Sequence, residues 1–428
     1  MSGFKRNSRS RSRKRIEIKS DLNITKIVVV VSIIVIVLAI IILQIKENNK
    51  NIEIAKRQDQ VSKILYDLYK ETKSYEDIDP SDFDLPDKVI NIVSLGDILC
   101  ETELYESAYD KSNEKYNFNS IFSDTKSYIE KADLAIASLE TNFVDGERIS
   151  GAGKYNAPIE LLDSIKDLGV DIINTANNHS FDYGLNGINS TINNLKERGI
   201  DNVGTYMTQE ERDSVFIKDV GGIKIAFLSY TYGSNVNNSV LKNNSYALNM
   251  IDKEKILSDM SKAKEEGADF TFLLMHWGEV NSSNINKEQE ELTDFLFENG
   301  ADFILGTHPA SIQKMEIREN TDGKNVFIAY STGNYISASR YTNSNIEMLL
   351  DIQLTKYPEK GATKLTKVTY IPVYLLDRGK NADQRYKLLD IRKEIDSFER
   401  DNLNNLSRDE FKKLLEASIT IDNLIYNR

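Results

Sequence analysis

The sequence predicts an α/β protein with a mainly parallel sheet, and three observations support this fold class. Short apolar runs recur from residue 89 onwards, helical patterns separate most of them, and several of those patterns end at a glycine. Such alternation is typical of βαβ units, and glycine commonly caps the C-terminus of a helix. The expected strands are Val89–Leu95, Leu134–Leu139, Val170–Thr175, Ile223–Ser229, Phe270–Met275, Phe303–Leu305 and Val326–Tyr330.

Apolar residues spaced three and four apart predict the helices between these strands. The expected helices are Phe118–Lys131, Pro158–Leu168, Gly187–Arg198, Lys253–Glu266 and Lys287–Asn299. Two glycines join Val215–Val220 to Ile223–Ser229, which predicts an antiparallel hairpin. Glu347–Leu354 and Lys364–Leu376 have the composition of strands and are expected to lie at the edge of the sheet.

The N-terminal region differs from the rest of the chain. Ile27–Ile45 contains no charged residue, and a helix of this length spans about 28 Å, close to the hydrocarbon core of a bilayer. A cleaved signal peptide is the alternative, but its apolar region is shorter and ends in small residues, whereas Lys46-Glu47-Asn48-Asn49 follows here. We therefore expect an uncleaved transmembrane helix over 27–45, followed by a stalk and acidic linker over 46–88.

The distribution of charge predicts the orientation of that helix. Residues 1–26 carry a net charge of +7, although the whole chain carries −12. Basic flanks stay on the cytoplasmic side, so we expect a cytoplasmic N-terminus and an extracellular main domain anchored to the cell membrane. A nucleic-acid patch is the alternative interpretation of the basic arm. Its place directly before the apolar run favours contact with anionic lipid, and no nucleic-acid partner is expected.

All three histidines of the chain follow the ends of predicted strands. His276 comes directly after Phe270–Met275, and His179 and His308 follow two other strands after short loops. Ligands of open α/β sheets bind at the carboxyl ends of the strands. The sequence therefore predicts that the three histidines belong to one site.

Oxygen donors follow strand ends as well, at Asp97, Glu140 and Asn178. Imidazole, carboxylate and amide oxygen without thiolate suit divalent Zn, Mn or Fe. Each residue has a structural alternative, because an aspartate after a strand is often a turn residue and a lone histidine often a hydrogen-bonded structural one. Five donors at strand ends favour a metal site instead. The predicted ligands are Asp97, Glu140, Asn178, His276 and His308.

Supporting roles are expected for neighbouring polar residues. Asp182 and Glu279 are spaced to orient imidazoles by hydrogen bonds, with solvated surface acids as the alternative. Asn334, after Gly333, is first interpreted as a turn residue.

Six motifs occur in an order that carries a family resemblance. They are Val93-Ser94-Leu95-Gly96-Asp97-Ile98, Ser138-Leu139-Glu140, Ala176-Asn177-Asn178-His179-x-x-Asp182-x-Gly184, His276-Trp277-Gly278-Glu279, Gly306-x-His308-Pro309 and Ser331-x-Gly333-Asn334. Together they resemble the bacterial CapA family of poly-γ-glutamate capsule proteins over about Val89–Ser339.

The resemblance implies the calcineurin-like metallophosphatase superfamily, an α/β/β/α sandwich with a metal site at strand ends. It implies such a domain over 89–340, with further strands of the same domain over 341–380 and a charged helical tail over 381–428. It also implies a membrane-anchored protein that makes or exports poly-γ-glutamate, or a related envelope polymer, beside capsule synthase or ligase subunits. An acidic polymer is a possible partner, but the acidic body of this chain would repel it unless a bound cation or a local basic patch intervened.

The resemblance also implies roles for individual residues. Asp97, Glu140, Asn178, His276 and His308 match metal ligands. His179 matches a catalytic histidine that contacts the scissile phosphate or its leaving group, and Asp182 stands beside it. Glu279 and Asn334 match positions that support the ligands. The implied chemistry is metal-dependent hydrolysis with one or two divalent ions; a non-catalytic scaffold or polymer-binding subunit, or a general envelope metallophosphoesterase, are the alternatives.

Three positions depart from the pattern of the family or superfamily. Leu99 stands where the superfamily has a histidine, Ala310 replaces the second histidine of the family's His-Pro-His motif, and Ser138 replaces an asparagine. A methyl group cannot bind a metal. We therefore expect one tightly bound ion and slow or absent hydrolysis of generic phosphodiesters.

Overall fold

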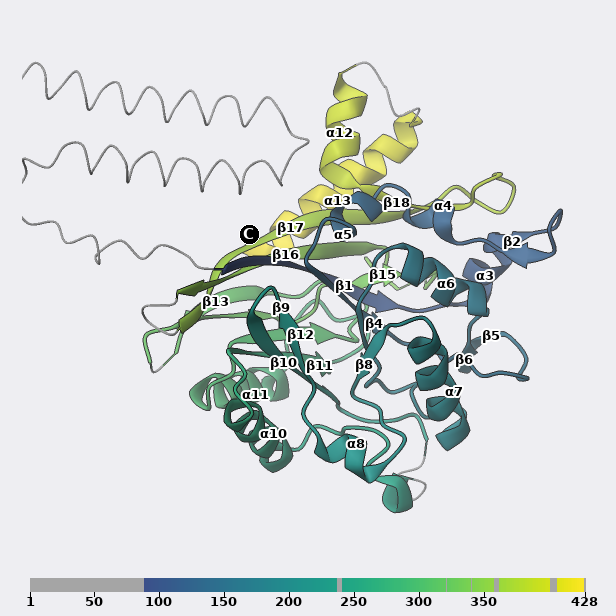
Figure 1. The fold of residues 1–428 in the computed structure, drawn as a ribbon. Helices are drawn as coiled ribbons and strands as arrows, with labels where there is room; N and C mark the ends of the chain where they lie inside the picture. Colours follow the sequence, from purple (N-terminus) through teal and green to yellow (C-terminus); the bar gives the residue numbers. More distant parts are fainter. Residues whose placement is uncertain are drawn as a thin grey trace, which may run out of the picture. The chain divides into compact units, whose positions relative to one another are not determined.

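The described part of the chain forms two large sheets and two small two-stranded ones (Figure 1). The structure is a computed structural model, and it describes residues 88–236, 241–320, 322–339, 341–357, 362–400 and 406–426. The first sheet has the order β18-β17-β16-β1-β4-β7-β8, and β15 pairs with the end of β1. Its strands are β1 (Lys88–Ile98), β4 (Leu134–Leu139), β7 (Ile172–Asn174), β8 (Asp201–Val203), β15 (Asn334–Ile336), β16 (Ile346–Tyr357), β17 (Ala362–Asp377) and β18 (Tyr386–Asp390).

The second sheet has the order β13-β14-β12-β11-β10-β9. Its strands are β9 (Ile217–Val220), β10 (Ile223–Thr231), β11 (Phe270–His276), β12 (Phe303–Thr307), β13 (Met315–Glu319) and β14 (Asn325–Ala329). β10, β11, β12 and β14 run parallel, and β9 forms the predicted antiparallel hairpin with β10. Strand–helix alternation by itself indicates one sheet, which is wrong, whereas the sandwich that the resemblance implies has two sheets. Hydrophobic periodicity locates strands, but it carries no information about which strands pair.

The two sheets pack face to face around a continuous apolar core. Ile92 of β1 and Leu350 of β16 share one buried cluster with Phe272 and Phe303 of the second sheet. The rings of Phe272 and Phe303 stack with their centroids 4.4 Å apart. Burial of each such side chain contributes about 1.5–3 kcal/mol, so this interface is a main source of stability.

Helices cover the outer faces of both sheets. α6 (Ile159–Asp167) packs its buried residues against the first sheet, and α10 (Lys253–Glu265) and α11 (Lys287–Glu298) pack against the second. The expected helix Phe118–Lys131 is broken into α4 (Asn119–Phe122) and α5 (Lys126–Ile129), between which the Thr125 hydroxyl donates to the carbonyl of Phe122. The remaining elements before residue 250 are α3 (Thr102–Ala108), β2 (Tyr109–Asp110), β3 (Lys115–Tyr116), β5 (Ser150–Ala152), β6 (Lys154–Asn156), α7 (Gly184–Glu197), α8 (Gln209–Asp213) and the 3₁₀ turn η2 (Lys242–Asn244).

The C-terminal region is part of the domain, although the sequence predicts a charged helical tail from residue 381. β18 completes the edge of the first sheet, so β16 and β17 are interior strands and not edge strands. α12 (Ile391–Glu399) and α13 (Arg408–Tyr426) follow it. Leu414 and Ile421 of α13 are buried in the same cluster as the residues between the sheets.

The expected transmembrane helix, basic arm and stalk lie outside the described residues. Within the described ranges, no helix combines the length and apolar character needed to cross a membrane.

Candidate metal centre

The predicted site residues lie at the carboxyl ends of strands from both sheets. Asp97 is in β1, Glu140 follows β4 and Asn178 follows β7, all in the first sheet. His276 ends β11 and His308 follows β12, both in the second sheet. The expectation that one sheet edge holds all five residues is therefore wrong. Two sheets, packed face to face, bring their carboxyl ends to the same place.

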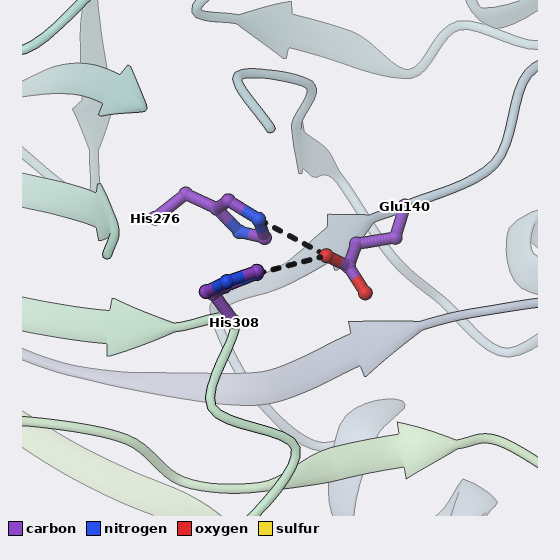
Figure 2. Close-up of side chains that lie close together, drawn as sticks. All are labelled: Glu140, His276 and His308. Atoms are coloured by element: carbon purple, nitrogen blue, oxygen red, sulfur yellow. Dashed lines mark ion pairs between the residues drawn. The ribbon is translucent and has the colours of Figure 1, made fainter. Parts of the chain in front are cut away.

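The centre of the site is formed by Glu140, His276 and His308 (Figure 2). Oε1 of Glu140 lies 3.0 Å from Nε2 of His276 and 3.7 Å from Nδ1 of His308. All three residues are buried, and their potential ligand atoms lie within 4.8 Å of one another. Donor atoms around a tetrahedral zinc ion, with bonds of about 2.0–2.1 Å, lie about 3.3 Å apart. The spacing of these donors therefore fits a metal ion.

Asn178 adds an oxygen donor to this centre. Its Oδ1 lies 2.8 Å from Nε2 of His276. Asn235 fixes the orientation of this amide, because Asn235 Oδ1 accepts a 3.3 Å hydrogen bond from Asn178 Nδ2 and the Asn235 backbone N–H donates to the carbonyl of Asn178. The amide oxygen of Asn178 consequently points toward the imidazole of His276.

Only one of the two carboxyl oxygens of Asp97 has a hydrogen-bond partner among the described residues. Its Oδ2 accepts a 2.8 Å hydrogen bond from the backbone N–H of His308. Its Oδ1 is buried and has no hydrogen-bond partner among the described residues. A buried acceptor without a partner is costly, and a cation would satisfy it.

The backbone of His308 is strained where it enters the site. Its φ is +95°, a conformation that residues with a Cβ rarely adopt. Backbone strain of this kind costs on the order of 1–3 kcal/mol and concentrates at functional sites. The hydrogen bond to Asp97 holds His308 in this conformation. Ala310 follows with a φ of +54°, and its buried methyl group offers no donor atom.

The carboxyl groups of Asp97 and Glu140 affect each other's pKa. Burial and the neighbouring Glu140 carboxylate raise the pKa of Asp97 to about 7. Burial alone would also raise the pKa of Glu140, but hydrogen bonds with the imidazoles of His276 and His308 outweigh it and hold the pKa of Glu140 below its usual range. Burial lowers the pKa of His276, which favours the neutral imidazole that binds metals. A bound divalent cation would favour the ionised form of both carboxyl groups.

His179 lies beside this centre and belongs to a separate pair with Asp182. Nδ1 of His179 is 2.9 Å from Oδ2 of Asp182, which also accepts a hydrogen bond from the backbone N–H of Tyr155. The ring of Tyr155 meets the imidazole edge-on at 4.6 Å. Asn235 links His179 to Asn178, since its Nδ2 lies 3.2 Å from both ring nitrogens of His179. Asp182 thus has the orienting position that the sequence predicts.

Neither of the two other predicted supporting residues orients an imidazole. Glu279 is exposed in the loop after β11, and Nδ1 of His276 instead lies 3.1 Å from the hydroxyl of Thr307. The side chain of Asn334 donates to the carbonyl of Ser344, and its backbone pairs with Asp97 in the first sheet. Thr307 fills the variable position of the Gly306-x-His308 motif, where the sequence offers no sign of its contact.

Tyr232, which sequence reasoning did not identify, covers the two histidines of the centre. It follows β10, and its ring centroid lies 4.7 Å from that of His308 and 6.2 Å from that of His276. The residue is 47% exposed. It therefore contacts the imidazoles on one side and solvent on the other.

Glu101 is a further buried carboxyl near the site, and it should make stability depend on pH. Its two oxygens accept hydrogen bonds from the Ser337 hydroxyl and the Ala338 backbone N–H. Burial raises the pKa of Glu101 to about 7, and Glu140 adds to the shift. Because the pKa is higher in the folded than in the unfolded chain, the folded state loses stability as pH rises from about 4.5 to about 7.

Glu101→Gln should remove this dependence. The amide resembles the protonated carboxyl, so the free energies of unfolding of the two proteins should be similar near pH 5. By pH 8 the variant should be more stable by about 3 kcal/mol. Urea unfolding at both pH values measures the difference. A difference that does not change with pH would contradict the prediction.

The fold and the site define a mixed α/β protein with a candidate metal centre at strand ends. The chain belongs to the bacterial capsule synthesis protein family (PGA_cap), which matches it over residues 91–339. It is 26% identical over 292 residues to "PGA biosynthesis protein CapA" of Bacillus subtilis, covering 67% of this chain and 73% of that protein. It is also 26% identical over 273 residues to "Capsule biosynthesis protein CapA" of Bacillus anthracis, covering 62% of this chain and 64% of that protein.

The chain is also similar to solved structures. A phosphatase from Mycoplasma pneumoniae is 15% identical, with a TM-score of 0.39, covering 67% of this chain and 94% of the other. The calcineurin-like phosphoesterase YfkN from Bacillus subtilis is 15% identical, with a TM-score of 0.38, covering 66% of this chain and 90% of the other.

Proposed function

We propose that this protein acts in the synthesis or export of a capsule polymer, poly-γ-glutamate or a related envelope polymer, and that its metal centre is a hydrolase site. Membership of the capsule synthesis family supports the first part. The observation that carries the second is the buried group of Glu140, His276 and His308, whose donor atoms converge with those of Asn178. The oxygens of Glu140 and Asn178 lie 3.0 and 2.8 Å from Nε2 of His276, a spacing that one cation could bridge.

The proposed chemistry divides between the centre and His179. A divalent Mn, Zn or Fe ion held by the five predicted ligands would polarise a phosphoryl or acyl oxygen of the substrate. Asp182 holds Nδ1 of His179 and fixes the orientation of the imidazole, so His179 is placed to accept a proton and return it to a leaving group. The rings of Tyr155 and Tyr232 contact the imidazoles of His179 and His308, respectively.

A non-catalytic scaffold or polymer-binding subunit is the second candidate, and Ala310 is the observation that favours it. Its methyl group stands where the resemblance places an imidazole, which leaves the centre with fewer ligands than a two-metal hydrolase uses. A general envelope metallophosphoesterase is the third candidate. In the first two candidate functions, the protein would act beside capsule synthase or ligase subunits.

The proposed location is the outer side of the cell membrane, anchored by Ile27–Ile45. The uncharged segment and the basic arm before it support this orientation. Protease added to intact cells that express the full chain should digest residues 88–428 and leave residues 1–26 intact, as detected with tags at the two ends. Protection of the C-terminal tag would contradict this topology.

Genetic complementation tests the proposed function. In the source bacterium, with the gene deleted, plasmids would supply the wild-type chain, Glu140→Gln, or Glu288→Gln, which makes the same chemical change on the exposed surface of α11. We expect wild type and Glu288→Gln to restore capsule polymer, measured by hydrolysis and amino-acid or sugar analysis, and Glu140→Gln to restore none at equal protein level.

The same strains separate the three candidates. Full polymer from Glu140→Gln, together with metal-independent production, would support the scaffold and overturn the hydrolase site. If purified full-length protein hydrolyses bis-p-nitrophenyl phosphate while the deletion leaves polymer unchanged, the general phosphoesterase is correct. Metal analysis of the same preparation shows whether one ion or two are bound.

A further inference from the structure

Thr307 is a buried polar residue whose hydroxyl lies next to the centre but is not among its donors. It is the last residue of β12 and pairs in register with His276, the last residue of β11. Its Oγ1 lies 3.1 Å from Nδ1 of His276, and the two residues are 1% and 0% exposed. Within the part of the chain that the structure describes, no other side chain hydrogen-bonds this nitrogen.

The two nitrogens of His276 face different surroundings, and this gives the Thr307 contact its importance. Nε2 faces Oε1 of Glu140 and Oδ1 of Asn178, whereas Nδ1 faces only the hydroxyl of Thr307. A neutral imidazole carries its proton on one nitrogen, and the hydrogen bond at that nitrogen decides which one is free to bind a metal. If Nδ1 donates its proton to Thr307, then Nε2 has a free lone pair directed at the other donors.

The local structure allows the Thr307 hydroxyl to accept that hydrogen bond. A hydroxyl has two acceptor lone pairs, so it is able to accept a hydrogen bond from an imidazole N–H. The backbone N–H of the next residue, His308, donates to Oδ2 of Asp97. Asp97 comes from the first sheet and His276 from the second. Thr307 therefore stands between the two sheets at the point where their ligands meet.

We propose that Thr307 is a positioning residue of the metal centre, which accepts a hydrogen bond from Nδ1 of His276 and so directs the Nε2 lone pair at the metal ion. This inference rests on the proposed metal centre and extends it to a residue outside the ligand set. Its branched Cβ in a strand restricts the hydroxyl to few rotamers, which suits this role.

Two matched pairs of variants test the role of the hydroxyl. Thr307→Val keeps the shape of the side chain and removes the hydroxyl, and Thr307→Ser keeps the hydroxyl and removes the methyl group. Thr307→Ala is the hydroxyl-free partner of the serine variant, and it keeps the test valid if the valine variant does not fold. Full-length protein in detergent would be titrated with Mn²⁺ and Zn²⁺ by calorimetry, with thermal unfolding recorded for each metal-free variant.

We expect Thr307→Val and Thr307→Ala to bind metal about 10- to 100-fold more weakly than their hydroxyl-bearing partners, as is typical for loss of a hydrogen bond to a ligating histidine. Thr307→Ser should retain near wild-type affinity, which a purely structural role of the threonine methyl would not produce. Equal affinities within both pairs, with wild type binding metal tightly, would overturn this inference and leave the proposed function standing. Failure of the wild-type chain to bind either metal would overturn both.

Discussion

Replacing His276 with alanine is expected to abolish tight binding of a divalent metal ion. His276 Nε2 lies 3.0 Å from Glu140 and 2.8 Å from Asn178, at the point where the donors of the two sheets converge. Loss of a hydrogen bond to a ligand typically weakens metal binding by about 10- to 100-fold, so loss of the ligand itself should exceed 100-fold. The measurement is calorimetric titration of the full chain with Mn²⁺ and Zn²⁺.

His179→Ala is the matched control for that experiment. It removes an imidazole from the same region, but His179 is paired with Asp182 and lies outside the group of Glu140, His276 and His308. Metal affinity should be unchanged in this variant. Any hydrolysis of a model phosphodiester by wild type should fall by about 10²- to 10⁴-fold in the variant, as expected for loss of a general acid–base. Equal loss of metal affinity in His276→Ala and His179→Ala would show that the proposed set of metal ligands is wrong.

Gly96→Ala is expected to destabilise the domain and to displace Asp97. A Cβ at Gly96 would overlap the backbone carbonyl oxygen of Gly333 and lie 2.8 Å from Oε1 of Glu347, which accepts a hydrogen bond from the Gly96 backbone N–H. Because the Gly333 carbonyl is backbone, rotating a side chain cannot relieve this clash. Overpacking in a buried region costs about 1–3 kcal/mol, and this site should lie at the upper end.

Gly233→Ala provides the comparison for Gly96→Ala. Gly233 lies near the site, in a loop after β10, and a Cβ there would meet no atom within 4 Å and require no unusual φ. Its free energy of unfolding should stay within about 0.5 kcal/mol of wild type. Urea unfolding measures both variants, and metal titration of the folded fraction reports on Asp97. Equal stability of Gly96→Ala and Gly233→Ala would contradict the close contact between Gly96 and the Gly333 carbonyl.

The sequence indicates most of the donor residues because each follows a local signal. Asp97, Glu140, Asn178, His276 and His308 follow apolar runs whose strands the structure contains, so their position at strand ends is readable without tertiary information. Whether they hold a metal ion stays a prediction. The same reasoning missed Thr307, Tyr232 and Glu101. A threonine in a strand, a tyrosine after one and a glutamate before a short helix have no special residue type or spacing.

The supporting residues show the limit of spacing as a guide. Asp182 follows His179 by three residues within one turn-rich segment, so its contact with the imidazole is local and predictable. Glu279 has the same spacing from His276, yet Nδ1 of that imidazole faces Thr307, which is 31 residues away in sequence. Strand pairing between β11 and β12 creates this contact, and spacing along the chain does not contain that information.

Local physical chemistry in the sequence determines the alternation of strands and helices, the hairpin of β9 and β10, and the residue types at strand ends, because these depend on neighbours within a few positions. Local patterns do not determine which strands join which sheet, that β18, α12 and α13 belong to the same core, or that His276 meets Glu140 and Asn178. Tertiary structure decides these features. These features depend on which apolar faces bury each other. Any strand with one apolar face can satisfy that requirement with many partners, and only the packing of the whole chain selects among them.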